Sequence, residues 1–307
     1  MGVMTTAQFA KLMYPGLNKI FGDNYKQYPP EYVKLYDVAT SKRAYEEDQG
    51  VTSFGLFSQK TESQQISFDE MKQAFTMRYV NKTFTSGFAI SQETIEDNQY
   101  DLSSIGIGQA SGLGRSARLS TEYIGATPFN RAFDSTLTYG DGYQMIGAAQ
   151  PTKTGPTWAN CPATMTDFNE LALEQACIDI AGFKDDKGNI IAVQAFSLHI
   201  PKELEFDVER TLKSVLRSDS ANNDINAVKS LGKLPGGVHI NHFFTDTDAW
   251  FIRTDITTDT GLRWFNRVAI EFAIDNDFKT TNALYRGRFR CSCGISDKRA
   301  IYGSQGA

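Results

Sequence analysis

The sequence predicts an α+β protein, because helical periodicity and strand alternation occur in separate parts of one chain. From Leu102 to Phe133, apolar residues recur at the three- and four-residue spacing of a long amphipathic helix. Residues 284–295 alternate apolar and polar side chains, as a strand does. With 307 residues, 41% of them hydrophobic, the chain is long enough for one large or two ordinary domains with a substantial core.

The first 50 residues are unusual in composition and weak in periodicity. They contain six of the thirteen tyrosines, interrupted by prolines. We expect one short helix after Pro30, with Tyr32, Leu35 and Tyr36 on one side. Tyrosine supplies contact area at low entropy cost and is enriched at interfaces. This segment is therefore either a subdomain packed on its own core or an extended arm that lies on neighbouring subunits.

Residues 50–91 are polar and read as strands. Phe75, Met77 and Tyr79 face one side of the expected strand, and the residues between them face the other. Few apolar residues accompany this pattern, and an isolated two-stranded ribbon is marginally stable in water. We therefore expect another surface to cover the ribbon, and a neighbouring subunit is one candidate.

The remaining elements follow from local signals. The polar segment 91–101 should lead into the long helix, and Asp167 with Glu170 predicts a capped helix that ends near Ala181. Further predicted elements are a turn at 185–190, a buried strand at 190–200, a helix at 202–216, and strands at 236–244, 248–255, 262–275 and 284–303.

No catalytic, cofactor or metal site emerges from the motifs. Gly106, Gly108 and Gly112 only approximate a dinucleotide loop, and glycines that ease the packing of a long helix are the simpler interpretation. His239 and His242 lie three apart in an expected strand and so face opposite sides, which disfavours one shared metal ion. With three histidines in all, no nucleophilic triad can be assembled. We therefore expect a protein that is not an enzyme and holds no cofactor.

The segment 284–303 combines arginines and cysteines. Alternation places Cys291 and Cys293 on an apolar face, where free thiols behave as small hydrophobic groups. Arg286, Arg288 and Arg290 share the opposite face, which needs carboxylates or phosphates to offset the repulsion of like charges. With a net charge of −5 and a pI of about 5.4, acidic neighbours in the sheet or a subunit interface are favoured over nucleic acid. Contact with nucleic acid remains an alternative.

The four cysteines are too few and too scattered to hold together a chain of this length, which favours a reducing compartment. No signal peptide is recognisable at the start, and no apolar run approaches the roughly 18 residues that span a bilayer. The sequence thus predicts a soluble protein that is made inside the cell and does not enter a membrane.

The order of these features resembles the major capsid protein of tailed bacteriophages, with its Hong Kong 97-type fold. Residues 12–25 ("LMYPGLNKIFGDNY") and 36–48 are similar to the N-terminal arm of that family, and 57–101 to its extended loop and the return to the spine helix. Residues 114–134 and "GDGYQM" are similar to the end of that helix. The most specific block is "DAWFIRT", "GLRWFNRVAIEFAIDND" and "RGRFRCSCGISDKRAIYGS" near the C-terminus.

The resemblance implies five regions: an N-terminal arm (1–50), an extended loop or E-loop (51–92), a peripheral domain with the spine helix (93–188), an axial domain (189–243), and return strands with a C-terminal tail (244–307). It implies pentamers and hexamers that form an icosahedral shell around double-stranded DNA in the virion, assembled in the host cytoplasm. Portal, scaffold and possible decoration proteins would be partners, and any scaffold or maturation protease would be a separate protein.

Within this resemblance, we hypothesise a subunit interface that includes two tyrosines of the arm and charged residues of the ribbon and the arginine face. Glu62 and Arg78 would help to form inter-subunit ion pairs. The full set is Tyr25, Tyr28, Glu62, Arg78, Arg286, Arg288 and Arg290. Two other functions remain open: a compartment of the encapsulin type, which encloses a cargo enzyme, and an enzyme with an unrecognised site.

Overall fold

The computed structural model describes residues 6–91, 93, 102–215, 225–256, 261–277 and 282–307. Its helices are α1 (Thr6–Tyr25), α2 (Tyr32–Leu35), α4 (Leu102–Asn130), α5 (Glu170–Ala181), α6 (Glu205–Lys213) and α7 (Ala227–Leu231). Its strands are β1 (Asp37–Thr40), β2 (Tyr45–Val51), β3 (Gln73–Val80), β4 (Lys82–Ile90), β5 (Ala195–Pro201), β6 (Gly237–Asn241), β7 (Trp250–Thr254), β8 (Leu262–Asn276), β9 (Ala283–Ile295) and β10 (Ile301–Ser304). The predicted α+β class is confirmed, whereas most of the expected lead-in at 91–101 lies outside the described residues.

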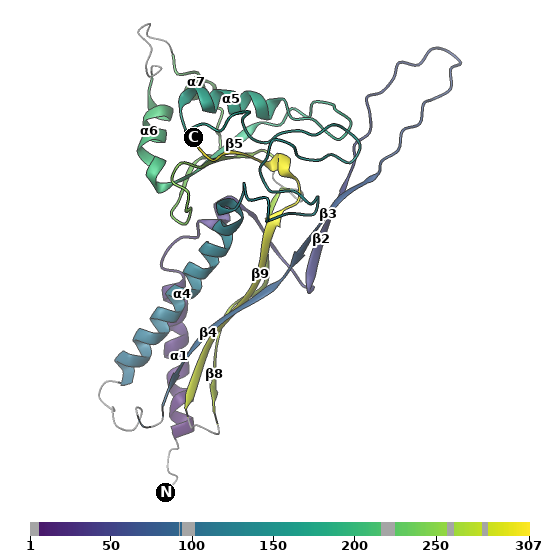
Figure 1. The fold of residues 1–307 in the computed structure, drawn as a ribbon. Coiled ribbons are helices and arrows are strands. Elements are labelled where there is room, and N and C mark those ends of the chain that lie inside the picture. The colour runs from purple at the N-terminus through teal and green to yellow at the C-terminus, as the bar shows by residue number, and fades with distance from the viewer. Residues whose placement is uncertain (1–5, 92, 94–101, 216–224, 257–260, 278–281) are drawn as a thin grey trace.

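The strands form two four-stranded sheets and one two-stranded ribbon (Figure 1). The long sheet has the order β1-β8-β9-β4, in which β8 and β9 pair antiparallel from Leu262 and Ile295 to Asn276 and Ala283. The second sheet has the order β10-β7-β5-β6, and β2 pairs with β3 in the ribbon. The C-terminal strands thus belong to both sheets, so each sheet is completed by segments that are distant in the sequence.

Two long helices lie side by side along the long sheet (Figure 1). The helix α4 confirms the helix predicted at residues 102–133. The poor periodicity before Pro30 gave no prediction of a helix there, but α1 is helical and continues through Pro15. An interior proline costs a helix about 3 kcal/mol. Burial of Leu17 and Phe21 against α4 and the sheet offsets this cost. A side chain at Gly114 would meet the Phe21 carbonyl oxygen at 2.6 Å, so this glycine permits the close approach of α1.

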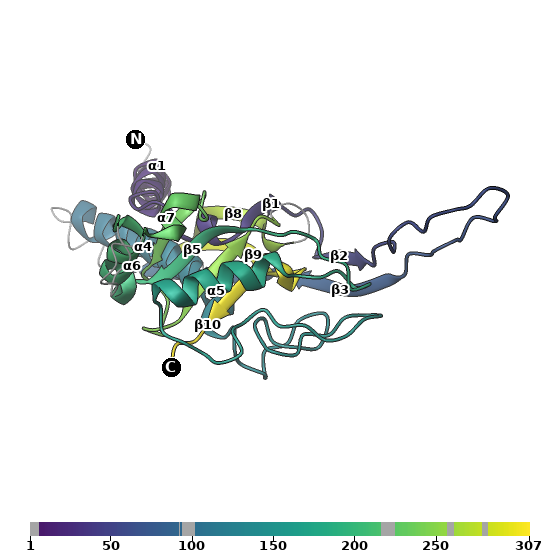
Figure 2. The ribbon, with the colours of Figure 1, turned by 90° about the horizontal axis from the view of Figure 1, so that it is seen from above.

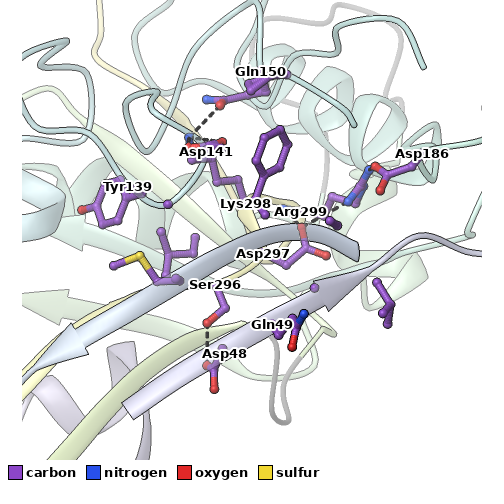
Figure 3. Close-up of a pocket in the computed structure, with 18 of the residues that line it drawn as sticks. Asp48, Gln49, Tyr139, Asp141, Gln150, Asp186, Ser296, Asp297, Lys298 and Arg299 are labelled. Carbon is purple, nitrogen blue, oxygen red and sulfur yellow. Dashed lines mark hydrogen bonds and ion pairs between the residues drawn. The ribbon is translucent and has the colours of Figure 1, made fainter. Parts of the chain in front are cut away.

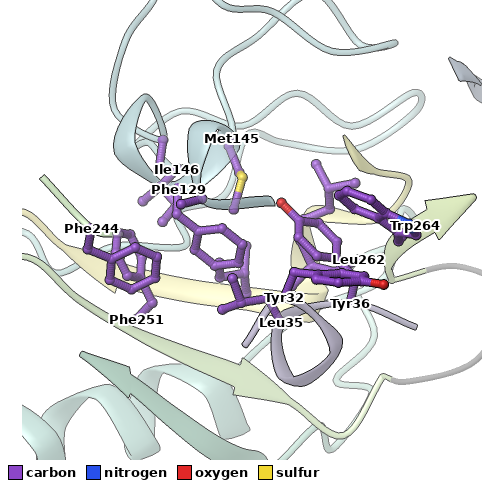
Figure 4. Close-up of a cluster of buried hydrophobic side chains, with 14 of the residues drawn as sticks. Tyr32, Leu35, Tyr36, Phe129, Met145, Ile146, Phe244, Phe251, Leu262 and Trp264 are labelled. Carbon is purple, nitrogen blue, oxygen red and sulfur yellow. The ribbon is translucent and has the colours of Figure 1, made fainter. Parts of the chain in front are cut away.

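An aromatic cluster joins α2, α4 and the long sheet (Figure 4). Tyr32, Leu35 and Tyr36 are all buried in it, as the sequence predicts for one side of a short helix. The ring of Tyr32 lies 4.4 Å from that of Trp264, and the Tyr36 hydroxyl donates to the carbonyl of Gly125 at 2.7 Å. Burial of large aromatic side chains is a major source of stability. This cluster therefore fixes residues 32–36 to the body of the protein.

A second core lies between α5 and the sheet β10-β7-β5-β6. Leu173 and Ile180 of α5 pack with Leu198 of β5 and Trp250 of β7. The expected boundary at 188/189 thus divides one hydrophobic core, a difference from the predicted domain limits. The strand predicted at 190–200 begins only at Ala195.

The predicted cap of α5 is wrong by two positions. Asn169 is the N-cap, because its side chain accepts from the amide of Ala172 at 2.8 Å. Asp167 instead accepts from the amide of Ala307 at 2.8 Å. The side chain of Asp167 thus binds the C-terminal segment and does not cap the helix. The helix predicted at 202–216 is observed as a 3-10 turn followed by α6, and α7 was not predicted.

The segment between α1 and β1 is anchored on α4 by a buried pair. Glu122 accepts from the amides of Glu31 and Tyr32 at 3.2 and 2.9 Å. Arg118 donates to the Tyr28 carbonyl at 3.0 Å, and its Nε lies 3.5 Å from Glu122. Burial raises the pKa of Glu122. These contacts hold the chain where it leaves α1.

We expect Glu122→Ala to lower the free energy of unfolding by roughly 3 kcal/mol, because a buried guanidinium and two amides lose their partner. Urea denaturation measures this change. The control is Glu209→Ala on α6, whose exposed pair with Lys213 contributes about 0.5 kcal/mol or less. Equal effects of the two substitutions would contradict an anchoring role for Glu122.

Candidate subunit interface

The ribbon extends into a long loop that projects away from the rest of the protein (Figure 2). Register pairs run from Tyr45 opposite Val80 to Val51 opposite Gln73. Residues 52–72 lie beyond the last pair, and no strand is assigned among them. The first strand of the ribbon begins at Tyr45, before the expected start of the E-loop at 51. The ribbon therefore uses residues that the prediction assigned to the N-terminal arm.

Apolar side chains gather on this projecting loop without a covering surface. Phe57 is fully exposed, and Leu56 and Phe68 are 84% and 88% exposed. The other exposed apolar residues of the loop are Phe54, Ile66 and Met71. Single exposed apolar residues are ordinary, but a group of this kind marks an interaction surface. These residues were not predicted as interface residues, although "FGLF" and "ISF" are the local signals from which they could have been found.

The base of the ribbon lies beside a cavity of about 460 Å³, which the loop 139–158 and the C-terminal 3-10 turn also line (Figure 3). The Ser296 hydroxyl donates to Asp48 of β2 at 2.6 Å and shares a hydrogen bond with Tyr79 of β3. Arg263 of β8 lies 3.3 Å from Asp48. Both strands of the ribbon are thus tied to the long sheet and the segment that follows it.

Lys298 is the most buried charged group at this cavity (Figure 3). Its Nζ lies 2.6 Å from an Asp141 carboxylate oxygen and donates to the Tyr143 carbonyl and the Gln150 side chain at 2.9 and 3.0 Å. Burial lowers the pKa of Lys298, and the hydrogen bond to Asp141 acts in the opposite direction. Every donor position of this ammonium is therefore used to join the C-terminal turn to the loop 139–158.

The projecting loop is also hydrogen-bonded to the turn at residues 185–189, which follows α5. Ser53 donates to Asp185 at 2.9 Å, and Lys187 donates to Asp69 at 2.7 Å. The hydrogen bond from Lys187 lowers the pKa of Asp69 to about 2. This turn, residues 185–189, is the one predicted from "DDKGNI". It holds both sides of the projecting loop, at Ser53 and Asp69, close to the ribbon and leaves the apolar tip free.

The two charged ribbon residues predicted for the interface lie in different settings. Glu62 is exposed in the projecting loop. Arg78 is paired within its own ribbon, since its Nε lies 2.6 Å from Glu47 and its guanidinium lies over the Tyr45 ring at 4.5 Å. An exposed guanidinium has further donors for a second carboxylate. The inter-subunit ion pairs of both residues stay a prediction.

The two predicted tyrosines lie where α1 ends. The ring of Tyr25 packs against the buried cluster that contains Leu17 and Phe21. It lies 5.3 Å from the guanidinium of Arg118. Tyr28 is 62% exposed. The chain around them packs on α4 and the long sheet of the same subunit and does not form a core of its own. Of the two rings, Tyr28 offers the larger surface to a neighbour.

The alternation predicted for β9 is confirmed. Phe289 and Cys291 are buried on the core side, where Cys293 also packs, and burial raises the pKa of both thiols to about 12. On the opposite face, Arg288 lies 3.2 Å from Glu271 of β8, and Arg290 donates to the Asn81 carbonyl at 3.3 Å. A carboxylate of the same sheet therefore faces one of the arginines.

Arg286 differs from the other two arginines of this face. It is exposed, and its guanidinium has no hydrogen-bond or ion-pair partner within the described part of the chain. Thr83 and Thr85 of β4 lie opposite Arg290 and Arg288 in the register and are also exposed. This face of β4 and β9 is thus open, polar and positively charged.

The described residues contain no group of three or more His, Cys, Asp or Glu side chains that could hold a metal ion. Across the same residues, no helix is both long enough and apolar enough to span a membrane. The glycines of the approximate dinucleotide motif lie within α4, where a phosphate-binding turn does not form. The site with the most distinctive features is therefore the projecting apolar loop with its anchored base.

A long helix packed on a four-stranded sheet, a second sheet with its own core, and a projecting hairpin define a protein of the Hong Kong 97-type capsid class. A phage capsid protein family model matches residues 74–304, and the chain belongs to this family. It is a shell-forming structural protein of the virion. The predicted fold and family are thus confirmed.

Solved structures with a similar fold share little sequence with the chain. A virus-like particle from Pyrococcus furiosus has 10% identity and a TM-score of 0.55, with 95% of this chain and 98% of that chain covered. The capsid of Cyanophage P-SCSP1u has 12% identity and a TM-score of 0.54, with 91% and 88% covered. A structure of Mycobacterium phage Patience has 11% identity and a TM-score of 0.55, with 100% and 93% covered. A search of curated proteins finds no match.

Proposed function

We propose that this capsid protein assembles as pentamers and hexamers into a closed icosahedral shell that encloses double-stranded DNA. The observation that carries the proposal is the apolar tip of the projecting loop, where Leu56, Phe57 and Phe68 are exposed. A single subunit has no second layer to cover this tip. In a shell, the same loop of every subunit reaches a neighbour, and repeated burial of these side chains stabilises the particle.

The anchored base supports this assignment. Asp48, Tyr79 and Ser296 connect both strands of the ribbon to the sheet, and Lys187 holds Asp69 close to the base. A loop whose origin is held in one orientation presents its tip in a defined direction, which lowers the entropy cost of association. The open arginine face around Arg286 is a second candidate contact, with carboxylates of a neighbouring copy as its partners.

The role we propose is structural rather than catalytic. The chemistry of the anchored base is used to fix the ribbon, as the fully engaged Nζ of Lys298 illustrates. Further proposed partners are a portal protein, a scaffold and decoration proteins, with assembly in the host cytoplasm. DNA would be held without sequence specificity, since the net charge of −5 gives no basic footprint for avid binding.

Purified full-length protein tests the proposal directly. Size-exclusion chromatography with light scattering and negative-stain microscopy should reveal closed particles with five-fold and six-fold capsomers. Particles recovered from infected cells should contain nuclease-protected double-stranded DNA. A stable monomer under all conditions would contradict shell formation, and open sheets or tubes alone would contradict the pentamers.

A second candidate keeps the shell and changes its contents. The similarity to the virus-like particle from Pyrococcus furiosus, which covers 95% of this chain and 98% of that one, favours considering a compartment of the encapsulin type. Such a particle would enclose a cargo enzyme instead of a genome. Protein analysis of purified particles discriminates the two, because a stoichiometric cargo protein without protected DNA would support the compartment.

The partner of the arginine face has its own test. Because Glu271 already faces Arg288 and the Asn81 carbonyl faces Arg290, we expect the variant R286Q/R288Q/R290Q to bind DNA as the parent does. Fluorescence anisotropy with a labelled duplex, measured over a range of salt concentrations, gives the number of phosphate contacts.

The matched control neutralises three exposed cations around α6, namely Lys202, Arg210 and Lys213. If the three arginines of β9 contacted phosphates, the slope of log K against log salt would become shallower by roughly 3 in their variant alone. That outcome would assign this face to DNA.

A further inference from the structure

All three histidines of the chain lie at one junction. His199 lies in β5 and His239 in β6, while His242 follows β6 directly. His199 and His239, together with Lys34, Leu35 and neighbouring backbone, line a cavity of about 290 Å³ between residues 29–35 and the second sheet. This junction joins the segment anchored on α4 to the sheet β10-β7-β5-β6.

His199 is the buried member of the group, with 1% of its surface exposed. Its Nε2 shares a hydrogen bond of 2.9 Å with the Ser197 hydroxyl. Its Nδ1 is buried without a hydrogen-bond partner among the described residues. The ring of His239 lies 5.1 Å away, tilted by 43°. A second proton on His199 would therefore find no acceptor among the described residues.

The charges that face His199 are positive on two further elements. Lys34 belongs to α2 and Arg253 to β7, and the Arg253 guanidinium donates to the Lys34 carbonyl and lies 2.6 Å from Asp37. Burial lowers the pKa of His199 well below its ordinary value, and His239, Arg253 and Lys34 lower it further. Asp37 is engaged by Arg253, and Glu31, which lines the same cavity as His199, is engaged by His242.

His239 is in a similar but more open environment. Burial lowers the pKa of His239, as does Lys34, whereas a hydrogen bond to the Gly236 backbone acts in the opposite direction. Desolvation and the cations of Arg253 and Lys34 thus disfavour the protonated form of both imidazoles. Protonating either one places an added positive charge next to Lys34 across the junction.

The outer part of the junction carries charges of the opposite sign. Glu31 accepts from the ring and the amide of His242 at 2.7 and 3.0 Å, and the Glu31 amide donates to Glu122. The pair of Glu31 and His242 is exposed and lies at the rim of the junction. Burial raises the pKa of Glu122, so its protonation does not oppose the folded state as pH falls. The acid-sensitive groups are therefore His199 and His239.

We propose that this junction is an acid-sensitive latch, in which neutral His199 and His239 keep residues 29–37 on the second sheet and their protonation releases this segment. The released segment carries α2 and leads into β1, so opening would loosen the link between the two sheets. The proposal concerns the folded subunit and does not depend on what the shell encloses.

The direction in which pH changes the opening equilibrium follows from proton binding. The open state takes up a proton on His199 near its ordinary pKa of about 6.5, while the latched state resists it. The latch is thus fully stabilised above about pH 6.5 and loses stability as pH falls below that value. If latched His199 stays neutral, the opening equilibrium rises about thirty-fold between about pH 8 and about pH 5.

Hydrogen–deuterium exchange on the full-length protein measures this opening. After correction for the intrinsic pH dependence of exchange, amides of residues 29–37 and 237–242 should exchange about thirty-fold faster at about pH 5 than at about pH 8. Amides of α5 should not change in parallel. Equal protection of the junction at both pH values, or a uniform loss across the whole chain, would overturn the latch.

Three variants separate the latch from general acid sensitivity. His199→Gln should lose most of the acid response, and His242→Gln should retain it, since His242 contacts Glu31 at the rim. If His199→Gln does not fold, His199→Phe serves in its place, because it keeps an uncharged ring in the buried position of the imidazole. A full acid response in the folded variant of His199, or its loss in His242→Gln, would overturn the assignment.

Discussion

Replacing Leu56, Phe57 and Phe68 by serine is expected to abolish particle formation while the subunit stays folded. These side chains are exposed on the projecting loop, so their loss removes no contact of the described core. In the assembled shell, burying one such side chain contributes about 1.5 to 3 kcal/mol, and each subunit would bury three. Light scattering and negative-stain microscopy measure the particle yield, and circular dichroism monitors the fold.

The control for this experiment changes polar residues of the same loop. Gln59, Thr61 and Gln65 replaced by serine alter the loop without altering its apolar surface. We expect normal particles from this variant. A normal yield from the first variant would contradict the docking of the loop on a neighbour, even if the protein still forms a shell through other surfaces.

The second large effect is expected from Lys298→Met, which should destabilise the subunit by about 3 to 5 kcal/mol. The side chains of Lys298 and Asp141 are only 6% and 11% exposed, so the substitution leaves a carboxylate buried without its ion-pair partner. The Tyr143 carbonyl and the Gln150 side chain also lose a donor. Chemical denaturation of the unassembled subunit measures the loss.

Lys202→Met is the matched control, because the ion pair of Lys202 with Glu203 is exposed and contributes about 1 kcal/mol or less. The double variant K298M/D141L should recover part of the loss, since it removes the unpaired charge as well. If Lys298→Met proved as mild as Lys202→Met, the link between the C-terminal turn and the loop 139–158 would not be a major source of stability.

Elements with a strong local pattern could be predicted from the sequence. The helix α4 and the strands β8 and β9 carry enough periodic residues for their type to be read directly, as does the short helix with Tyr32, Leu35 and Tyr36. The alternation of β9 also separated the thiols from the arginines correctly. These features depend on residues that are neighbours in the sequence.

The errors arose where a distant partner decides the local structure. Helix α1 contains Pro15, and it is stabilised by burying Leu17 and Phe21 against α4 and the long sheet. Asn169 caps α5, and Asp167 instead binds the C-terminal segment. Neither choice can be derived from local propensity, since tertiary contacts of a few kcal/mol outweigh it.

The features of the candidate interface could likewise be predicted only in part. Charge, aromatic content and the shortage of apolar residues in the ribbon could be read from the sequence alone. The pairing of Arg78 with Glu47, the position of Glu271 opposite Arg288 and the exposure of the loop tip are visible only in the folded protein. Pairing and exposure depend on strand register and on segments that are far apart in the chain, which the local sequence does not specify.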